Sequence, residues 1–373
     1  MVSLQDIATI NPKSDPLQNT FIYIDLEAVE KGELRKIQEI MREEAPSRAQ
    51  RVIDNNDILF QCVRPYQKNN YIHRILNTSN QQWVASTGYA QIRTTELPNY
   101  IYHLLNTDEF NRKVMVRCTG SSYPAINSED LATIHLYYTP DKKEQLKISR
   151  LLDLLDKRIA TQNKIIEDLK KLKSAIIEEH YKQAKKQSIR VADLGKSFTV
   201  GSLSKEDLSE TGKPCVIYGE LFTTYGATIN QVESHTNKFD GMTLSKKGDL
   251  LFPSSTTVDA VSLIAPSAIN VDNVILGGDM FGIHIDSDFN AQYLSYYFNH
   301  IAKKQLAKYA KGSTIIHLHY KDIEKAQLLL PCLEKQNKIA VCLVLLDERI
   351  AVENKFLKSL ACQKSYLIEH MFI

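Results

Sequence analysis

The sequence predicts an α+β protein in which two repeated mixed α/β domains, residues 1–140 and 188–331, are separated by two long helices, residues 141–187 and 332–373. Three observations predict this fold. A coiled-coil heptad pattern fills the first helix, the same pattern returns in the second, and strand-like runs precede each helix in the same order. The two helices should therefore pair with each other as an antiparallel coiled coil.

The heptad pattern consists of apolar residues in alternating steps of four and three, as a coiled-coil seam requires. In the first helix these residues are Ile148, Leu152, Leu155, Ile159, Ile166, Leu169 and Ile176. In the second helix they are Ile339, Leu343, Leu346, Ile350, Leu357, Leu360 and Leu367. Polar residues fill the remaining seam slots at Gln162 and Lys173, and at Glu353 and Lys364. Antiparallel pairing would bring Ile148 to Leu367 and Ile176 to Ile339.

Identities outside the seam show that the helices are copies of each other. They include the pairs Gln145/Gln336, Asp156/Asp347, Arg158/Arg349 and Asn163/Asn354. Exposed helix positions have no packing reason to agree, so the sequence predicts an internal duplication.

The domain before the first helix mixes strands with helices. Predicted strands cover residues 21–24, 57–60, 83–85 and 90–93, and a shorter one covers 133–138. One amphipathic helix is predicted from Tyr100 to Val116, with Ile101, Leu104, Leu105 and Phe110 on its apolar face.

The second domain repeats this order. Asp249–Phe252 matches Asp57–Phe60, and the helical stretch Tyr293–Tyr309 matches the helix from Tyr100. The stretches between these matches, such as residues 203–248, do not align. One frame therefore appears twice with different variable inserts.

Composition limits the function only weakly. The chain is 43% apolar, enough for a substantial core, and its formal net charge of +2 permits nucleic-acid binding without arguing for it. The six cysteines are scattered without a Cys-x-x-Cys pair, which favours a reducing cytoplasm. No stretch resembles a signal peptide, and the longest apolar run, Ile339–Leu346, is too short to span a bilayer.

Catalytic motifs are missing. Asp193–Ser197 resembles the end of a phosphate-binding loop, but Arg190 stands where that loop requires its first glycine. Asp168 could imitate a nuclease carboxylate, yet it lies within the predicted coiled coil. His317 and His319 would share one face of a strand but lack a third metal ligand nearby. The sequence therefore predicts a non-catalytic protein without a bound metal or cofactor.

Two loops in each domain carry side chains suited to DNA. One follows the strand at 57–60 and the other follows the predicted helix that begins at Tyr100. Arg and Lys can bind phosphate or guanine, Asn can read adenine, and hydroxyls at a Gly-containing turn can bind phosphate. The candidate DNA-binding residues of the first domain are Arg64, Tyr66, Lys68, Asn69, Asn70, Ser121, Ser122 and Tyr123.

The matching loops of the second domain are richer in hydroxyl groups. Their candidate DNA-binding residues are Ser254, Ser255, Thr256, Thr257, Lys311, Ser313, Thr314 and His317. Any one of these loops could be an ordinary solvated turn. Their recurrence in both domains favours contact with DNA.

These residues carry a resemblance to a known family. The run Gly120-Ser121-Ser122 through Asp130-Leu131, followed by Pro140, Gln145 and Leu155–Ile159, resembles the end of a target-recognition domain leading into a conserved helix. The second copy, from Pro331 through Leu346–Ile350, is similar. This paired pattern resembles the specificity subunits of type I restriction–modification systems.

The resemblance implies a specificity subunit that takes part in defence against foreign DNA. It implies that each target-recognition domain reads half of a bipartite double-stranded DNA site. It also implies that two methyltransferase subunits dock on the helices and that a restriction subunit joins for cleavage. S-adenosylmethionine would belong to the methyltransferase, so this subunit would bind no cofactor of its own.

Two other interpretations remain open. The coiled coil could space two protein-binding modules without reading DNA, or the chain could be a detached enzyme fragment. The missing catalytic motifs disfavour the second. A DNA-binding assay with the partner methyltransferase separates the first from a specificity subunit.

Overall fold

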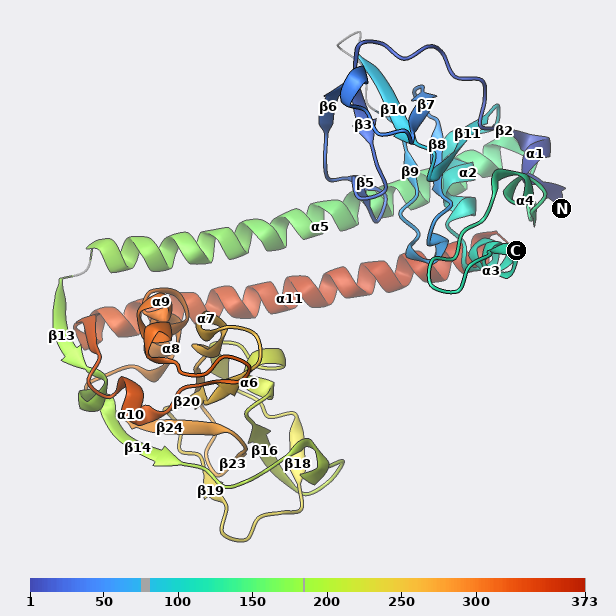
Figure 1. Ribbon diagram of the computed structural model, residues 1–373. Helices are drawn as coiled ribbons and strands as arrows, with labels where there is room; N and C mark the ends of the chain where they lie inside the picture. Colours follow the sequence, from blue (N-terminus) through green and yellow to red (C-terminus); the bar gives the residue numbers. More distant parts are fainter. Residues whose placement is uncertain (75–80, 184, 373) are drawn as a thin grey trace. The chain divides into compact units, whose positions relative to one another are not determined.

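The computed structural model describes residues 1–74, 81–183 and 185–372 of the chain (Figure 1). It contains two compact units. The first unit comprises Met1–Asn163 together with Lys355–Ile373, and the second comprises Lys164–Asn354. Each long helix therefore contributes one part to each unit.

Two four-stranded sheets form the body of the first unit. One has the order β6-β3-β10-β7, and only its β3–β10 pair is parallel. The other is antiparallel throughout, with the order β2-β11-β8-β9. Their strands are β6 Gln38–Met41, β3 Thr20–Ile24, β10 Gln82–Ser86, β7 Ala49–Ile53, β2 Ala8–Ile10, β11 Tyr89–Thr94, β8 Ile58–Gln61 and β9 Tyr71–Ile72.

Short elements complete this unit. The remaining strands form two pairs, β1 Val2–Ser3 with β12 His135–Leu136 and β4 Val29–Glu30 with β5 Glu33–Leu34. The helices are α1 Leu4–Ile7, α2 Pro98–Leu105, α3 Asp108–Arg117 and α4 Ser128–Ala132, with 3-10 turns η1 Arg42–Glu44 and η2 Pro65–Gln67.

The single helix predicted from Tyr100 to Val116 is wrong in one respect, because α2 and α3 are separate helices. Thr107 stands between them in an extended conformation, and its hydroxyl accepts a hydrogen bond from the Phe110 backbone N–H at 3.1 Å. Threonine is a favoured N-cap because its side chain satisfies a free N–H at the start of a helix. The apolar pattern continues from α2 into α3, and for this reason it does not reveal the break between the two helices.

Two five-stranded sheets form the second unit. Their orders are β14-β24-β20-β22-β17 and β15-β18-β16-β23-β19. The strands of the first are β14 Gly195–Thr199, β24 Met280–Ile285, β20 Asp249–Pro253, β22 Ser267–Ile269 and β17 Thr228–Ile229. Those of the second are β15 Leu208–Ser209, β18 Ser234–Thr236, β16 Lys213–Ile217, β23 Ile275–Gly277 and β19 Thr243–Leu244.

The smaller elements of the second unit connect these sheets. The strands form two antiparallel pairs, β13 Lys186–Arg190 with β26 Gln327–Pro331 and β21 Ser255–Thr256 with β25 Ile316–His317. The helices are α6 Glu220–Thr223, α7 Ala260–Leu263, α8 Ala291–His300, α9 Lys303–Leu306 and α10 Tyr320–Ile323, with 3-10 turns η3 Val191–Leu194, η4 Lys205–Asp207 and η5 Ala307–Tyr309.

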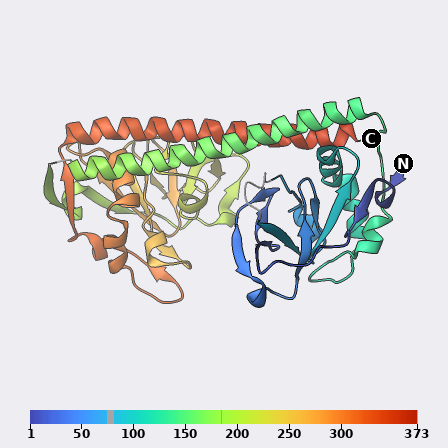
Figure 2. The ribbon, with the colours of Figure 1, turned by 90° about the horizontal axis from the view of Figure 1, so that it is seen from above.

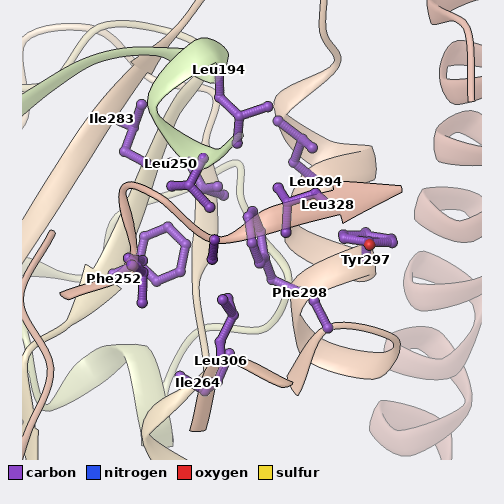
Figure 3. Packing of buried hydrophobic residues seen from close by; sticks show 14 of the residues in the cluster. Leu194, Leu250, Phe252, Ile264, Ile283, Leu294, Tyr297, Phe298, Leu306 and Leu328 are labelled. Carbon is purple, nitrogen blue, oxygen red and sulfur yellow. The ribbon is translucent and has the colours of Figure 1, made fainter. Parts of the chain in front are cut away.

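The main core of the second unit packs α8 against the sheet that contains β20 and β24. Phe252 and Phe281 stack with ring centroids 5.0 Å apart, and Phe298 of α8 meets Phe252 edge-on at 5.2 Å. Leu194, Leu250 and Leu328 close the cluster around these rings (Figure 3). Burial of such large side chains is the main source of stability here.

The two units share one frame, as the sequence predicts. Asp57 precedes β8 and Asp249 begins β20, and both carboxylates are buried and accept a hydrogen bond from a turn N–H three residues earlier. Arg93 of β11 binds Asp57, whereas His284 of β24 binds Asp249 at 2.6 Å. The same buried carboxylate therefore orders the same strand pair in each unit with a different partner.

The long helices are α5 Lys142–Gln183 and α11 Leu333–Met371. Every seam residue predicted above is buried or half-buried, and Gln162 and Glu353 are buried too. The predicted end of the first helix at Gln187 is wrong, because Lys186–Arg190 is β13, paired with β26. The polar backbone of this segment is satisfied by that strand instead of by another helical turn.

Antiparallel helix pairing is confirmed within each unit. In the first unit, Asp156 of α5 pairs with Lys364 of α11, and Arg158 lies over the Phe356 ring at 5.5 Å. Figure 2 shows the start of α5 lying beside the end of α11 in this unit. Numbers that rise along α5 thus meet numbers that fall along α11. In the second unit, Lys173 pairs with Asp347 at 2.6 Å, and Ile177 shares an apolar cluster with Leu343.

Candidate nucleic-acid interface

The two candidate loops of the first unit, residues 63–70 and 119–125, lie together and are called the first loop pair. Val63 forms a β-bridge with Ala125, and the Arg64 N–H donates to the Pro124 carbonyl at 2.7 Å. Thr119 and Ala125 exchange two backbone hydrogen bonds of 2.9 Å, which close the loop of residues 119–125. Gly120 has a φ of +91° within it, a conformation that glycine adopts without strain.

The second unit holds its candidate loops, residues 254–257 and 311–317, in the same way, and they are called the second loop pair. Strand β21 pairs with β25, so Ser255 lies opposite His317. Lys311 and His317 exchange backbone hydrogen bonds of 2.9 and 2.7 Å around Gly312, which has a φ of +113°. The structure therefore brings the predicted loops together in both units.

Arg64 has an unusual backbone conformation and an aromatic partner in the first loop pair. Its backbone is left-handed, with φ 56° and ψ 53°, a conformation that is unfavourable for arginine. Its guanidinium lies 4.3 Å from the centre of the Tyr123 ring, which contributes a cation–π attraction. Within residues 1–74, 81–183 and 185–372, no carboxylate forms an ion pair with Arg64, so its hydrogen-bond donors remain available.

Arg64 and the Tyr123 ring are together called the clamp. Beside it lies a cleft of about 740 Å³, lined by residues of both loops and of the β3–β5 region. Leu26, Val29 and Val63 contribute apolar surface to it, and Tyr123 stands at the same opening. The polar groups that line it are Glu27, Glu30, Arg35, Arg48, Gln61, Arg64, Gln67 and Asn69. Apolar walls with a few converging polar groups are typical of a binding site.

Sequence reasoning missed six of these residues: Glu27, Glu30, Arg35, Arg48, Gln61 and Gln67. Gln61 ends β8, and the η2 turn that follows folds back toward it. The side-chain amide of Gln61 donates to Gln67 Oε1 at 2.9 Å. Arg48 immediately precedes β7 and also lines the cleft. Of these six residues, only Gln61 could have been recognised from the sequence, because it is a polar residue at the end of a buried strand.

Most of the predicted DNA-binding residues have side chains that reach solvent. The exposed ones are Tyr66, Ser121, Ser122, Tyr123, Thr257, Lys311, Ser313, Thr314 and His317. The half-buried ones are Arg64, Lys68, Asn69 and Thr256.

Three of the predicted DNA-binding residues are buried, and contact of their side chains with DNA stays a prediction. Asn70 is 2% exposed, and its amide binds the Gln61 N–H and Asn106. Ser254 and Ser255 are 3% and 8% exposed, and the Ser254 carbonyl accepts from the Leu318 N–H. The Asn70 amide thereby stabilises its loop from within, which explains why this polar residue of a surface loop does not face solvent.

The predicted lysines are held by carboxylates. The Lys68 ammonium pairs with Asp108 and also donates to the Asn106 carbonyl at 3.2 Å. Lys311 pairs with Asp322 at 2.5 Å, and this hydrogen bond holds the pKa of Asp322 below its ordinary value. Both lysines position their loops, and a phosphate would have to compete with these carboxylates for them.

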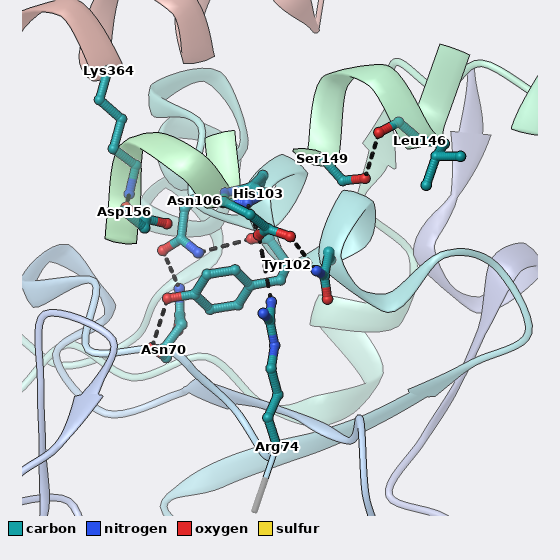
Figure 4. Close-up of polar contacts among 11 residues, drawn as sticks. Asn70, Arg74, Tyr102, His103, Asn106, Leu146, Ser149, Asp156 and Lys364 are labelled. Carbon is teal, nitrogen blue, oxygen red and sulfur yellow. Dashed lines mark hydrogen bonds and ion pairs between the residues drawn. The ribbon is translucent and has the colours of Figure 1, made fainter. Parts of the chain in front are cut away.

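A polar cluster fixes the first unit's domain to α5 (Figure 4). Asp153 accepts from Asn99 and lies 2.9 Å from the buried ring of His103, both on α2, with Arg74 at 3.5 Å. Burial alone would raise the pKa of Asp153, but the hydrogen bonds from His103 and Asn99 outweigh it and lower that pKa. The carboxylate therefore remains charged at neutral pH.

The cross-helix ion pairs repeat with the duplication. Asp156–Lys364 and Asp347–Lys173 join matching positions of the two helix copies. Tyr296 of α8 adds a hydrogen bond of 2.7 Å to Asp347, and burial followed by this carboxylate raises the pKa of the Tyr296 hydroxyl. Matching pairs of this kind support an internal repeat independently of the sequence identities.

Large apolar residues also face away from the seam. Leu154 is 63% exposed and its copy Leu345 is 59% exposed, and each lies on a helix in its own unit. Exposed leucines at matching positions of a duplicated helix have no role in the cores. The duplication therefore keeps an exposed leucine at the same position of each helix.

Two further features bear on chemistry. In the part of the chain that the structure describes, no group of three or more His, Cys, Asp or Glu residues is arranged to hold a metal ion. None of the described helices is long and apolar enough to cross a membrane.

A family model matches both halves of the chain. Residues 1–171 and 184–361 match the type I restriction modification DNA specificity domain, once in each half of the chain. The HindI specificity subunit of Haemophilus influenzae is 23% identical over 172 residues. That alignment covers 45% of this chain and 34% of the relative, so the chain matches about a third of that protein's length.

Solved structures share the fold over the whole chain. The type I restriction–modification S subunit from M. genitalium is 14% identical with a TM-score of 0.65, covering 100% of this chain and 95% of that one. A chain from a study of complex assembly and conformational transition of the type I R-M system is 20% identical with a TM-score of 0.59, covering 100% and 96%. Because the family model matches both duplicated halves, this chain belongs to the type I restriction–modification DNA specificity family.

Proposed function

We propose that this chain is the DNA-reading, non-catalytic subunit of a type I restriction–modification complex. Each loop pair contacts one half of a bipartite duplex target, so that the complex is placed on a particular sequence. The observation that carries this proposal is the loop pair itself. Two units built on one frame present two loops at the same place, with different side chains on them.

The side chains of the loop pairs suit duplex DNA. The first pair offers a guanidinium, amides and two exposed aromatic residues, and the second offers hydroxyls and the imidazole of His317. Amides and arginine read base edges, whereas hydroxyls and backbone N–H groups bind phosphates. Two readers with different chemistry fit a target whose two halves differ.

The partners follow from the helices. Two methyltransferase subunits would dock on the exposed apolar positions near Leu154 and Leu345, one on each duplicated surface. S-adenosylmethionine and the transferred methyl group would belong to those subunits, and a restriction subunit would join them for cleavage. Replacing both leucines with Asp should abolish methyltransferase capture, whereas the same change at the exposed Val116, which lies outside the long helices, should not.

The test of the proposal is methylation mapping. The chain, purified with its methyltransferase, should protect a two-part sequence in footprinting and direct methylation to adenines within it. A scaffold that only spaces two protein-binding modules predicts capture of proteins without protection of any DNA sequence. That result would refute the proposal.

A further inference from the structure

The cleft of the first unit presents hydrogen-bond donors in fixed orientations. The Asn69 N–H donates to Gln61 Oε1 at 3.1 Å, so the Gln61 amide must use its NH2 group toward Gln67 Oε1. The oxygen of Gln67 is thereby occupied, and its own NH2 group is left to donate. Asn69 Oδ1 accepts from the Lys31 N–H at 3.0 Å, which leaves the Asn69 NH2 group to donate as well.

These amides stand with Arg64 along one cleft. Gln61 is 3% exposed, so the group that orients Gln67 is itself buried and rigid. The Tyr123 ring holds the Arg64 guanidinium, and the left-handed backbone at Arg64 is fixed by the hydrogen bond to Pro124. Strained backbone of this kind persists where the surroundings fix it, often at functional sites.

A cleft lined by hydrogen-bond donors favours a ligand that offers hydrogen-bond acceptors. In the major groove guanine offers two adjacent acceptors, N7 and O6, whereas adenine and thymine each offer one and cytosine offers a donor. A phosphate also accepts, and Arg35 and Arg48 line the same cleft together with Glu27 and Glu30, so the experiment below separates a base contact from a phosphate contact. Within the described residues the Glu27 carboxylate has no ion pair, and it could accept from the N4 amino group of the paired cytosine.

We propose that this cleft reads one G·C base pair in the half-site of the first unit. Arg64 and Gln67 donate to guanine, and Glu27 accepts from the paired cytosine. The proposal rests on the proposed function, because it assigns a base to a chain that reads DNA. Thr256 and Ile315 occupy the matching positions of the second loop pair, so the second unit lacks this clamp.

The test uses the full chain assembled with its methyltransferase. Methylation mapping first defines the target sequence. Each guanine is then replaced in turn by 7-deazaguanine, which lacks the N7 acceptor, and duplex affinity is measured. The wild-type complex should lose roughly tenfold in affinity at one guanine. The Arg64→Ala complex should bind both duplexes equally, whereas the Val116→Ala complex, changed at an exposed position outside both loop pairs, should keep the tenfold difference.

A phosphate contact predicts another result. Arg64→Ala would then weaken all duplexes equally, lower the salt dependence of binding, and leave the 7-deazaguanine effect unchanged. That outcome would overturn the proposal while leaving the proposed function intact. A wild-type complex that methylates without sequence preference would overturn both.

A second variant covers the case in which Arg64 variants do not fold. Gln67 is exposed, so Gln67→Glu should fold normally while replacing the donor with a carboxylate. It should abolish the preference for guanine at the same position and leave the other half-site unchanged. An unchanged preference for guanine in this variant would also overturn the proposal.

Discussion

The first and second loop pairs have the same backbone architecture and different chemistry. In each, a segment that follows a buried strand bridges a turn that contains a glycine with positive φ. The first pair places Arg64 over Tyr123 beside a cleft. The second pair places Thr256 and Ile316 in paired strands and stacks His317 on His319, with ring centroids 6.2 Å apart.

This difference separates two functions of the repeated frame, which are to position the loops and to present side chains at their opening. Backbone hydrogen bonds position the loops and depend little on side-chain identity, apart from the glycine that the turn requires. The side chains at the opening are then free to differ, because they contribute little to the cores beneath. A duplicated frame can therefore read two unrelated sequences.

The largest effect is expected from exchanging a whole reader. Replacing residues 1–140 with the first domain of another family member should change one half of the methylated motif and leave the other half intact. The cores of the two units are separate clusters, so the second unit should retain its structure. If methylation mapping shows both halves changed, the two loop pairs do not read independently.

The matched ion pairs give the next largest effect. Asp347 binds both Lys173 and the buried Tyr296 hydroxyl, whereas Asp156 binds Lys364 at a more exposed position. Asp347→Ala should lower the free energy of unfolding by about 3 kcal/mol, because it leaves a buried hydroxyl without its acceptor. Asp156→Ala should cost about 1 kcal/mol. Equal losses in urea unfolding would contradict this ranking, and Tyr296→Phe combined with Asp347→Ala is the control.

The loop glycines provide a closer comparison. A Cβ at Gly312 would lie 2.0 Å from the Ile315 carbonyl oxygen, whereas at Gly120 it would lie 3.0 Å from the Tyr123 carbonyl oxygen. Gly312→Ala should therefore cost about 2 kcal/mol of stability, and Gly120→Ala about 1 kcal/mol. Thermal unfolding measures both, and a larger loss for Gly120→Ala would show that the two turns are not equivalent.

The smallest effect concerns acid. The pKa of Asp153 is lowered in the folded state, so its contribution is present above the ordinary value of 3.8 and is lost as the pH falls through the lowered value. Asp153→Asn should cost about 1 kcal/mol at neutral pH and nothing below both values. Val344 stands at the matching position of the second unit, so hydrogen exchange in acid should rise for α2 and not for α8. A similar rise in α8 would assign the effect to another group.

The long helices and the duplication could be predicted from the sequence because both depend on periodicity. Seam residues must recur at fixed steps whatever surrounds them, and all of them are buried or half-buried. The break between α2 and α3 could not be predicted in this way. There the apolar period runs through Thr107, and only the hydrogen bond to Phe110 reveals the new helix.

The loops could be predicted, but the direction of their side chains could not. A polar residue in a loop can face solvent or bind backbone groups, and Asn70, whose Oδ1 accepts from the Gln61 N–H, does the second. The cleft depends on contacts between separate strands and turns, as with Gln61 and Gln67. The sequence of one chain does not reveal such tertiary contacts.

The composition of the first unit has a consequence for synthesis on the ribosome. Residues 355–373 belong to this unit, and Ile368 is buried in its core beside Leu152 of α5. Those residues emerge after the whole of the second unit, although most of the first unit emerges before it. Part of the apolar core of the first unit therefore stays uncovered while the second unit is synthesised. The unit whose synthesis starts first is therefore the one that is completed last.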